Sequence, residues 1–150
     1  MNVTLQLASK NHLADIVSLV KAYHEFEKII LSDQEREQAI AKLLADQTLG
    51  GIWLIYAESK RVGYIVLCTG YSIEFAGLDA FIDEFYILPQ SRNKGIGTRV
   101  LDLIKGEAKK LNIRALHLEV ARTNQHAQNL YSKANFKARD KYVLMSVDLE

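Results

Sequence analysis

The spacing of hydrophobic residues changes several times along this chain, and each spacing predicts one kind of element. Apolar residues recur every three or four positions in four segments, which predicts helices that start after Ser9, after Ser32, at residue 96 and at residue 124. Between them, apolar residues alternate with polar ones or form short runs, which predicts strands at residues 3–8, 52–58, 62–71, 80–88, 113–121 and 141–149. The resulting order is β-α-α-β-β-β-α-β-α-β.

Local signals set the boundaries of these elements. Ser9 and Ser32 are typical N-cap residues, and Glu35 forms a capping box with Ser32. The pair Gly50–Gly51 is expected to end the second helix, and a tight turn at residues 59–60 joins the next two strands as an antiparallel hairpin. The first helix is expected to bury the apolar residues at its helical spacing, Leu13, Ile16, Val17, Val20 and Phe26. This order predicts an α/β chain with a mixed sheet and helices on both faces.

Length and composition indicate one globular domain over residues 1–150. The chain is 49% hydrophobic and 25% charged, which is enough apolar material for one core and leaves no room for a second domain. Its net charge is +1 and its Lys and Arg residues are scattered, so we expect neither nucleic acid nor an anionic membrane as a partner. No apolar run approaches the ~20 residues of a membrane-spanning helix, and the N-terminus lacks a signal-peptide pattern, so we expect a cytoplasmic protein.

The cysteine and the histidines give few candidates for catalysis or metal binding. Cys68 is the only cysteine, which excludes an internal disulfide and a cysteine-based zinc site, and its apolar surroundings indicate a buried thiol. His24 is a candidate base, but a lone helix histidine is more often structural or solvated, and His117 is expected to pack in a sheet face. No set of His, Asp and Glu has the spacing of metal ligands, so we expect no metal.

The segment "SRNKGIGTRVL", residues 91–101, places two glycines among basic residues at the predicted start of a helix. It is not a Walker A loop, because its Gly, Lys and Thr residues stand in the wrong order, and it is not a dinucleotide fingerprint, because Val100 stands where the third glycine is needed. The remaining interpretation is an anion-binding turn, in which glycines let backbone amides approach a pyrophosphate at the helix N-terminus. The alternative is an ordinary flexible turn with solvated Arg92 and Lys94.

Residues 80–104, "AFIDEFYILPQSRNKGIGTRVLDLI", resemble motif A of the GNAT acyltransferase superfamily, which consists of an acidic strand, the pattern R/Q-x-x-G-x-G/A and a helix. Residues 124–136, "NQHAQNLYSKANF", resemble motif B of the same family, and the order of elements agrees over nearly the whole chain. Asn135 replaces the usual Gly of motif B, and Asn tolerates the left-handed conformation that ends a helix there. The resemblance implies the GNAT fold, with about six to seven strands in a sheet that is splayed where acyl-CoA binds.

The resemblance also implies that acetyl-CoA is the acyl-donor cosubstrate. The pantetheine arm is expected to pair with the backbone of the splayed strand at Phe85, Tyr86 and Ile87. The pyrophosphate is expected on the backbone amides of the glycine loop, which consists of Arg92, Asn93, Lys94, Gly95, Ile96, Gly97 and Thr98. Asn124 is expected to reach the CoA arm, and Tyr131 matches the family's acid, which protonates the departing thiolate.

An amine attacks a thioester only as its free base, and an ammonium group with a pKa near ~10.4 is mostly protonated at pH 7, so the reaction needs a base. Asp83 and Glu84 lie on the strand before the glycine loop, and strand geometry directs only one of them toward the substrate. We favour Asp83, which matches the acidic position of the polyamine-type members of the family, and Glu84 is the second candidate. The alternative is that the pair only attracts a cation or holds the loop, and that water is the base.

Two segments, residues 19–29 and 71–81, are expected to form walls of the acceptor cleft, with substrate contacts from Tyr23, Glu25, Glu74 and Asp83. Together with Asp79, these acids suit a small basic amine. The expected function is direct transfer of an acetyl group to a primary amine of a small cationic molecule, or to a lysine-like side chain, in a ternary complex. The alternatives are a non-catalytic acyl-CoA-binding or sensing module on the same fold, and an acyltransferase for oxygen acceptors or longer acyl chains. Edge strands in such folds often pair, so a homodimer is one expected assembly.

Overall fold

A computed structural model describes the whole chain, residues 1–150. The chain forms two compact units, Met1–Glu119 and Val120–Glu150. The first unit holds the sheet and three α-helices, and the second holds one α-helix and the C-terminal residues. No helix in either unit is long and apolar enough to cross a lipid bilayer. The expectation of a single domain over residues 1–150 stays a prediction.

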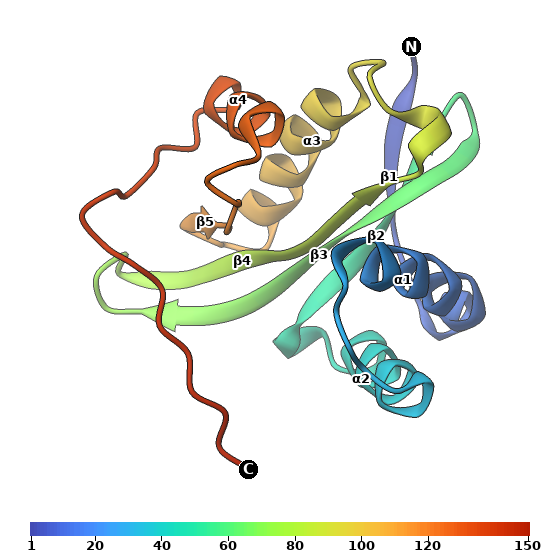
Figure 1. Cartoon of the computed structure of the whole chain (residues 1–150), viewed down its shortest axis with the longest axis horizontal. Helices are drawn as coiled ribbons and strands as arrows, with labels where there is room; N and C mark the ends of the chain where they lie inside the picture. Colours follow the sequence, from blue (N-terminus) through green and yellow to red (C-terminus); the bar gives the residue numbers. More distant parts are fainter. The chain divides into compact units, whose positions relative to one another are not determined.

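The first unit is built on a five-stranded mixed sheet in the order β1-β2-β3-β4-β5 (Figure 1). Its strands are β1 (Val3–Leu7), β2 (Gly50–Ala57), β3 (Lys60–Ser72), β4 (Gly77–Ile87) and β5 (Ala115–His117). Neighbours from β1 to β4 are antiparallel, and β5 is parallel to β4, which confirms the predicted mixed sheet. The β2–β3 hairpin turns at Glu58 and Ser59, with φ values of 50° and 67°. β5 is shorter than the strand predicted at residues 113–121.

Helices cover both faces of this sheet, as predicted (Figure 1). α1 (Leu13–Glu27) and α2 (Asp33–Ala45) pack on one face, where helix residues Ile16, Val20 and Ile40 cluster with strand residues Ile52, Leu54, Tyr64, Val66 and Tyr86. α3 (Ile96–Lys110) covers the other face and buries Ile96, Val100, Leu101, Ile104 and Ala108. Burying a large apolar side chain contributes roughly 1.5–3 kcal/mol, so apolar contacts hold both helical layers.

The end of α1 buries a different residue from the one expected. Phe26 is 60% exposed, whereas His24 is only 5% exposed. Ile16, Val20 and His24 follow one another at four-residue spacing and form one buried stripe. Phe26 lies about 200° around the helix from His24, so the prediction that Phe26 belongs to the stripe is wrong.

Polar side chains set both ends of α2. At the start, the Glu35 amide donates to Ser32 Oγ at 3.1 Å and the Ser32 hydroxyl donates to Glu35 Oε1 at 2.8 Å, which confirms Ser32 as the N-cap. At the end, Asp46 accepts the Thr48 amide at 3.0 Å and begins a short 3-10 turn. Hydrogen bonds from Thr48 lower the pKa of Asp46. The prediction that Gly50–Gly51 ends the helix is therefore wrong, and these glycines begin β2 instead.

β4 departs from regular pairing where the predicted site residues lie. The register of the β3–β4 ladder shifts there and leaves Asp83, between Ile82 and Glu84, as the extra residue of a β-bulge. On the opposite edge, β5 pairs with β4 only at residues 79–81. The rest of β4 continues without β5 paired to it, which is the splayed arrangement expected from the family resemblance.

The second unit contains α4 (Gln125–Lys133) and a C-terminal segment without regular structure. The helix ends as expected: Asn135 has a φ of 72°, and the Phe136 amide donates to the Tyr131 carbonyl at 3.0 Å. Residues 141–149, predicted as a strand, form none, so the sheet has five strands and not six to seven. Alternation of apolar residues permits a strand, but a strand exists only through hydrogen bonds to a neighbouring strand.

Candidate active site

The glycine loop after β4 leads directly into α3. A 3-10 turn (Pro89–Ser91) follows the strand, Asn93 and Gly95 have φ values of 62° and 80°, and the helix begins at Ile96. Gly95 is the N-cap, and because a Cβ atom there would meet nothing within 4 Å, the backbone conformation and not space favours glycine. No side chain caps the first turn and no acidic residue lies in it. The first amides of α3 therefore lack an acceptor within the helix, which suits this loop to an anion.

Arg92, expected to hold the pyrophosphate, is anchored at the end of β4. Its Nε donates to the Ile87 carbonyl at 2.8 Å, and its guanidinium lies 5.0 Å from the ring centroid of Phe26 and 5.4 Å from that of Tyr86. Each such cation–π contact contributes about 0.5–1 kcal/mol at an exposed site. One side chain thus connects the glycine loop to β4 and α1, and the exposed Phe26 ring is part of that connection.

The two acidic residues of the β4 bulge lie in different environments. Asp83 is exposed, whereas the Glu84 side chain is 17% exposed. Glu84 Oε2 lies 2.7 Å from His24 Nε2, and Glu84 Oε1 accepts a hydrogen bond from the Tyr64 hydroxyl at 2.8 Å. Burial, with the nearby charge of Glu84, raises the pKa of the Tyr64 phenol, so Tyr64 stays a donor. The structure thus holds Glu84 at both oxygens and leaves Asp83 in solvent.

His24 links Glu84 to a buried arginine. Arg36 Nε donates to His24 Nδ1 at 3.1 Å, and both residues are 5% exposed. The remaining guanidinium nitrogens donate to Asp33 Oδ1 and to the Leu31 carbonyl, each at 2.9 Å. A continuous set of hydrogen bonds therefore runs from the start of α2, through α1, to the bulge of β4.

Cys68 lies close to both carboxylates of the bulge. It packs against the apolar cluster under α1 and α2, and it is partly buried. Burial first, and then the charges of Asp83 and Glu84, raise the pKa of the Cys68 thiol to about 11. The thiol is therefore mostly protonated at neutral pH, where it is a weak nucleophile.

The residues predicted for the acceptor cleft come together only in part. Tyr23 packs on Tyr64 and Tyr86, with ring centroids 6.3 Å and 5.7 Å apart, so Tyr23 lies beside the hydrogen bonds of Glu84. Glu25 is exposed on α1, and Glu74 is exposed in the turn between β3 and β4. The predicted substrate contacts of these two acids stay predictions.

A second histidine–carboxylate pair lies nearer the start of β4. His117 Nε2 is 3.0 Å from Asp79 Oδ2, and the two side chains are 20% and 17% exposed. The rings of Phe75 and Phe81 flank the imidazole, with centroids 5.0 Å and 5.3 Å from it. Asp79, expected to add negative charge to the acceptor cleft, is thus paired with a histidine.

Arg36 and Tyr64 are part of the site and are not among the residues predicted from the sequence. Arg36 precedes Ile40 by four residues on the buried stripe of α2, and a charged residue on an apolar stripe is a signal for a buried hydrogen-bonded partner. Tyr64 carries no such signal, because it resembles any inward-facing aromatic residue of a strand. Both residues gain their roles from partners on other elements.

The second unit carries the residues predicted from motif B. Asn124 is the N-cap of α4, and its Oδ1 accepts the Ala127 amide at 3.1 Å. Tyr131 lies in the last turns of α4, and its ring centroid is 5.9 Å from that of Phe136. The expected roles of Asn124 at the CoA arm and of Tyr131 as the acid stay predictions.

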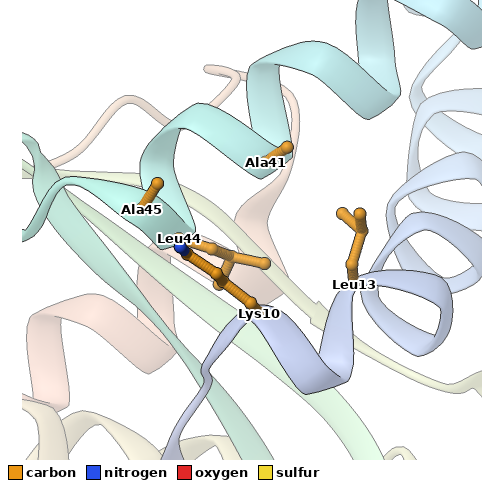
Figure 2. A pocket seen from close by; sticks show the side chains of 5 residues that line it. All are labelled: Lys10, Leu13, Ala41, Leu44 and Ala45. Atoms are coloured by element: carbon orange, nitrogen blue, oxygen red, sulfur yellow. The ribbon is translucent and has the colours of Figure 1, made fainter.

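A pocket of about 270 Å³ opens between the start of α1 and the end of α2 (Figure 2). Its lining is apolar apart from one ammonium group, and it consists of Lys10, Leu13, Ala41, Leu44 and Ala45. No predicted site residue lines this pocket, so it is separate from the hydrogen bonds of Glu84. The structure places no three His, Cys, Asp or Glu side chains together as a metal ion would need, and the expected absence of a metal stays a prediction.

Known proteins resemble this chain in sequence and in fold. Residues 13–136 match the family model described as "Acetyltransferase (GNAT) family". An integron cassette protein from a salt-marsh metagenome has a crystal structure with a TM-score of 0.84 and 30% identity, covering 97% of this chain and 91% of that one. A predicted acetyltransferase from Clostridium acetobutylicum, crystallised with acetyl-CoA, has a TM-score of 0.77 and 22% identity over 97% of this chain and 96% of that one. Thialysine N-epsilon-acetyltransferase of Mus musculus is 24% identical over 141 residues, 83% of this chain and 78% of that protein. The chain belongs to the GNAT acetyltransferase family.

Proposed function

We propose that this chain is an acetyl-CoA-dependent N-acetyltransferase that moves the acetyl group directly to a primary amine in a ternary complex. The observation that carries the proposal is Glu84, an oriented carboxylate at the bulge of the strand that leads into the glycine loop. Family membership supports acetyl transfer in general. The oriented carboxylate supports an amine acceptor, because an amine must lose a proton when it attacks a thioester.

The chemistry of the donor side fits acetyl-CoA. The first turn of α3 presents uncapped amides, and Arg92, Lys94 and Arg99 add positive charge around that turn. Beyond residues 79–81 the edge of β4 has no pairing with β5, so the backbone at residues 85–87 is suited to pair with an extended chain that contains amides. Acetyl-CoA supplies the acetyl group as an activated thioester.

Glu84 is proposed to take the proton from the attacking amine, directly or through one water. The sequence favours Asp83 for this role, but the contacts with His24 and Tyr64 give only Glu84 a defined orientation. The exposed Asp83 adds negative charge for an incoming ammonium group. As the nitrogen bonds to the carbonyl carbon, the carbon–sulfur bond breaks, and Tyr131 is proposed to protonate the leaving thiolate.

The proposed acceptor is a small cationic amine or a lysine-like side chain. Asp83 and Glu84 concentrate negative charge at one bulge, and the Tyr23 ring packs beside the partners of Glu84. The mouse relative is named for N-epsilon acetylation of thialysine, which supports an amine acceptor of this kind.

A panel of amines tests this function. The purified protein is mixed with acetyl-CoA and with polyamines, amino sugars and lysine analogues, and thiol release is followed. Saturable release with one class of amine is expected. Saturable binding of acetyl-CoA without turnover of any amine would indicate a non-catalytic acyl-CoA-binding module. Turnover only with hydroxyl acceptors or longer acyl donors would indicate a different acyltransferase.

The role of Tyr131 is tested in the same assay with Tyr131→Phe. If the phenol is the acid, kcat falls by roughly 10²–10⁴ while acetyl-CoA affinity is unchanged. Tyr142→Phe, a tyrosine that is 58% exposed, is the matched control. An unchanged kcat in Tyr131→Phe would remove this residue from the reaction.

A further inference from the structure

The buried hydrogen bonds behind Glu84 determine the state of the group that donates to it. We propose that Arg36 is a positioning residue, which acts by fixing His24 as the neutral tautomer with its proton on Nε2, so that His24 and Tyr64 hold Glu84 as an oriented carboxylate. The effect on turnover rests on the acetyltransferase function proposed above. The tautomer itself does not, because it follows from the hydrogen bonds alone.

Arg36 is held from three sides at the start of α2. Its guanidinium donates to Asp33 Oδ1 and the Leu31 carbonyl at 2.9 Å, and to His24 Nδ1 at 3.1 Å. A guanidinium has only donors and stays protonated in proteins. The nitrogen that faces Arg36 Nε must therefore be an acceptor, and so His24 Nδ1 carries no proton.

This assignment leaves one proton for the His24 ring, and it lies on Nε2. Nε2 is 2.7 Å from Glu84 Oε2, so it donates to that oxygen. In the opposite tautomer, Nδ1–H would face the Arg36 N–H and the Nε2 lone pair would face the Glu84 oxygen, and both buried hydrogen bonds would be lost. A doubly protonated ring would still carry a proton on Nδ1, and that proton would face the Arg36 N–H. The buried surroundings of His24 and Arg36 leave little water to relieve either arrangement.

Glu84 receives a second donor from the sheet itself. The Tyr64 hydroxyl donates to Glu84 Oε1 at 2.8 Å, and Tyr64 is fully buried. Both oxygens of Glu84 thus act as acceptors, an arrangement that suits a carboxylate able to take a proton from an amine. Because His24 lies on α1 and Tyr64 lies on β3, their two hydrogen bonds also restrict the side-chain torsions of Glu84. Arg36 thus acts on Glu84 without touching it.

The tautomer of His24 is measured by nitrogen NMR of the full-length protein at neutral pH. The chain has 4 histidines, and the variant His24→Gln identifies the His24 signals by their loss. In the wild type we expect protonated Nε2 and unprotonated Nδ1, and in Arg36→Met a mixture of tautomers. A wild-type ring protonated at Nδ1, or at both nitrogens, overturns the proposal whatever the enzyme's activity. If no amine is acetylated but the tautomer is as expected, only the proposed function has failed.

A double-mutant cycle tests whether Arg36 acts through His24. In His24→Gln the amide nitrogen can still donate to Glu84, and it has no tautomer to fix. We expect Arg36→Met to lower kcat by roughly tenfold or more in the wild type, with the KM for acetyl-CoA within about twofold, and to have little further effect on His24→Gln. Equal losses in both backgrounds would show a general structural effect and overturn the proposal.

The matched control is Arg61→Met, which replaces an arginine that is paired with Asp15 and is not part of the site. It should leave kcat and the NMR signals of His24 unchanged. If Arg36→Met does not fold, Arg36→Lys keeps the charge but removes the planar guanidinium, and the same two measurements apply. A wild-type kcat together with a wild-type tautomer in Arg36→Lys would show that the guanidinium itself is unnecessary, which contradicts the proposal.

Discussion

His24–Glu84 and His117–Asp79 are two histidine–carboxylate pairs whose carboxylates lie on β4, and they differ in what contacts the histidine ring. The first pair is 2.7 Å apart, with a His24 side chain that is 6% exposed, and the second is 3.0 Å apart, with a His117 side chain that is 20% exposed. Arg36 donates to the ring of His24, whereas aromatic rings flank His117. The same two residue types therefore form one pair whose ring accepts a hydrogen bond from an arginine and one pair whose ring is flanked by aromatic side chains.

The arginine decides this difference. With Arg36 donating to Nδ1, the ring of His24 keeps its proton on Nε2 and donates to Glu84. Phe75 and Phe81 carry no side-chain donor, so these rings do not fix the tautomer of His117. The pair at the bulge is thus suited to orient a base, whereas the flanking rings give no such orientation to the pair nearer the start of β4.

The largest contrast is expected between Glu84→Gln and Asp79→Asn. If Glu84 is the base, Glu84→Gln lowers kcat by roughly 10²–10⁴, because the amide cannot accept the amine proton. Asp79→Asn should change kcat by only about two- to threefold, since Asp79 lies outside the bulge and is not proposed to transfer a proton. Steady-state kinetics with acetyl-CoA and the best amine measure both variants.

Asp83→Asn is the decisive third variant in that series. A loss in Asp83→Asn as large as the one expected for Glu84→Gln, with Glu84→Gln nearly active, would return the role of base to Asp83. Similar small losses in all three variants would indicate that water is the base.

A smaller contrast is expected in stability. Arg36→Met leaves the buried His24 Nδ1 and the partly buried Leu31 carbonyl without their donor, which should lower the free energy of unfolding by about 2–4 kcal/mol. His117→Leu replaces half of a more exposed pair and should cost about 1 kcal/mol or less. Denaturant unfolding measures both. A larger cost at His117 than at Arg36 would contradict the view that the bulge pair is the more tightly held.

The smallest effect is expected at Cys68, whose thiol has a pKa of about 11 because of burial and the charges of Asp83 and Glu84. The thiolate fraction rises as the pH approaches this value, so alkylation of Cys68 should be slow near neutral pH and faster in alkali. Asp83→Asn removes one negative charge, lowers the pKa of Cys68 and should speed alkylation at about pH 9 by roughly two- to threefold. Asp79→Asn is the control, and an equal acceleration there would place both carboxylates at similar range of the thiol.

Much of the fold could be predicted because its signals are local. The apolar spacing of α3, the N-cap at Ser32 and the left-handed Asn135 each depend on a few neighbouring residues, and the structure contains all three. The errors lie where a local pattern competes with a partner. Asp46 ends α2 before the glycines are reached, and residues 141–149 have the alternation of a strand but form none.

The candidate site shows the same difference between local signals and contacts of distant residues. The sequence by itself determined the family motifs, the order of nearly all elements, the glycine loop at the start of α3 and the presence of two adjacent carboxylates, because each is written in contiguous residues. Only the tertiary structure decided which carboxylate is held, by placing a bulge at Asp83 and by bringing His24, Arg36 and Tyr64 from three elements to Glu84. Those residues are 12 to 60 positions apart in the chain, and hydrogen bonds over such separations depend on how the helices pack on the sheet, which no local pattern contains.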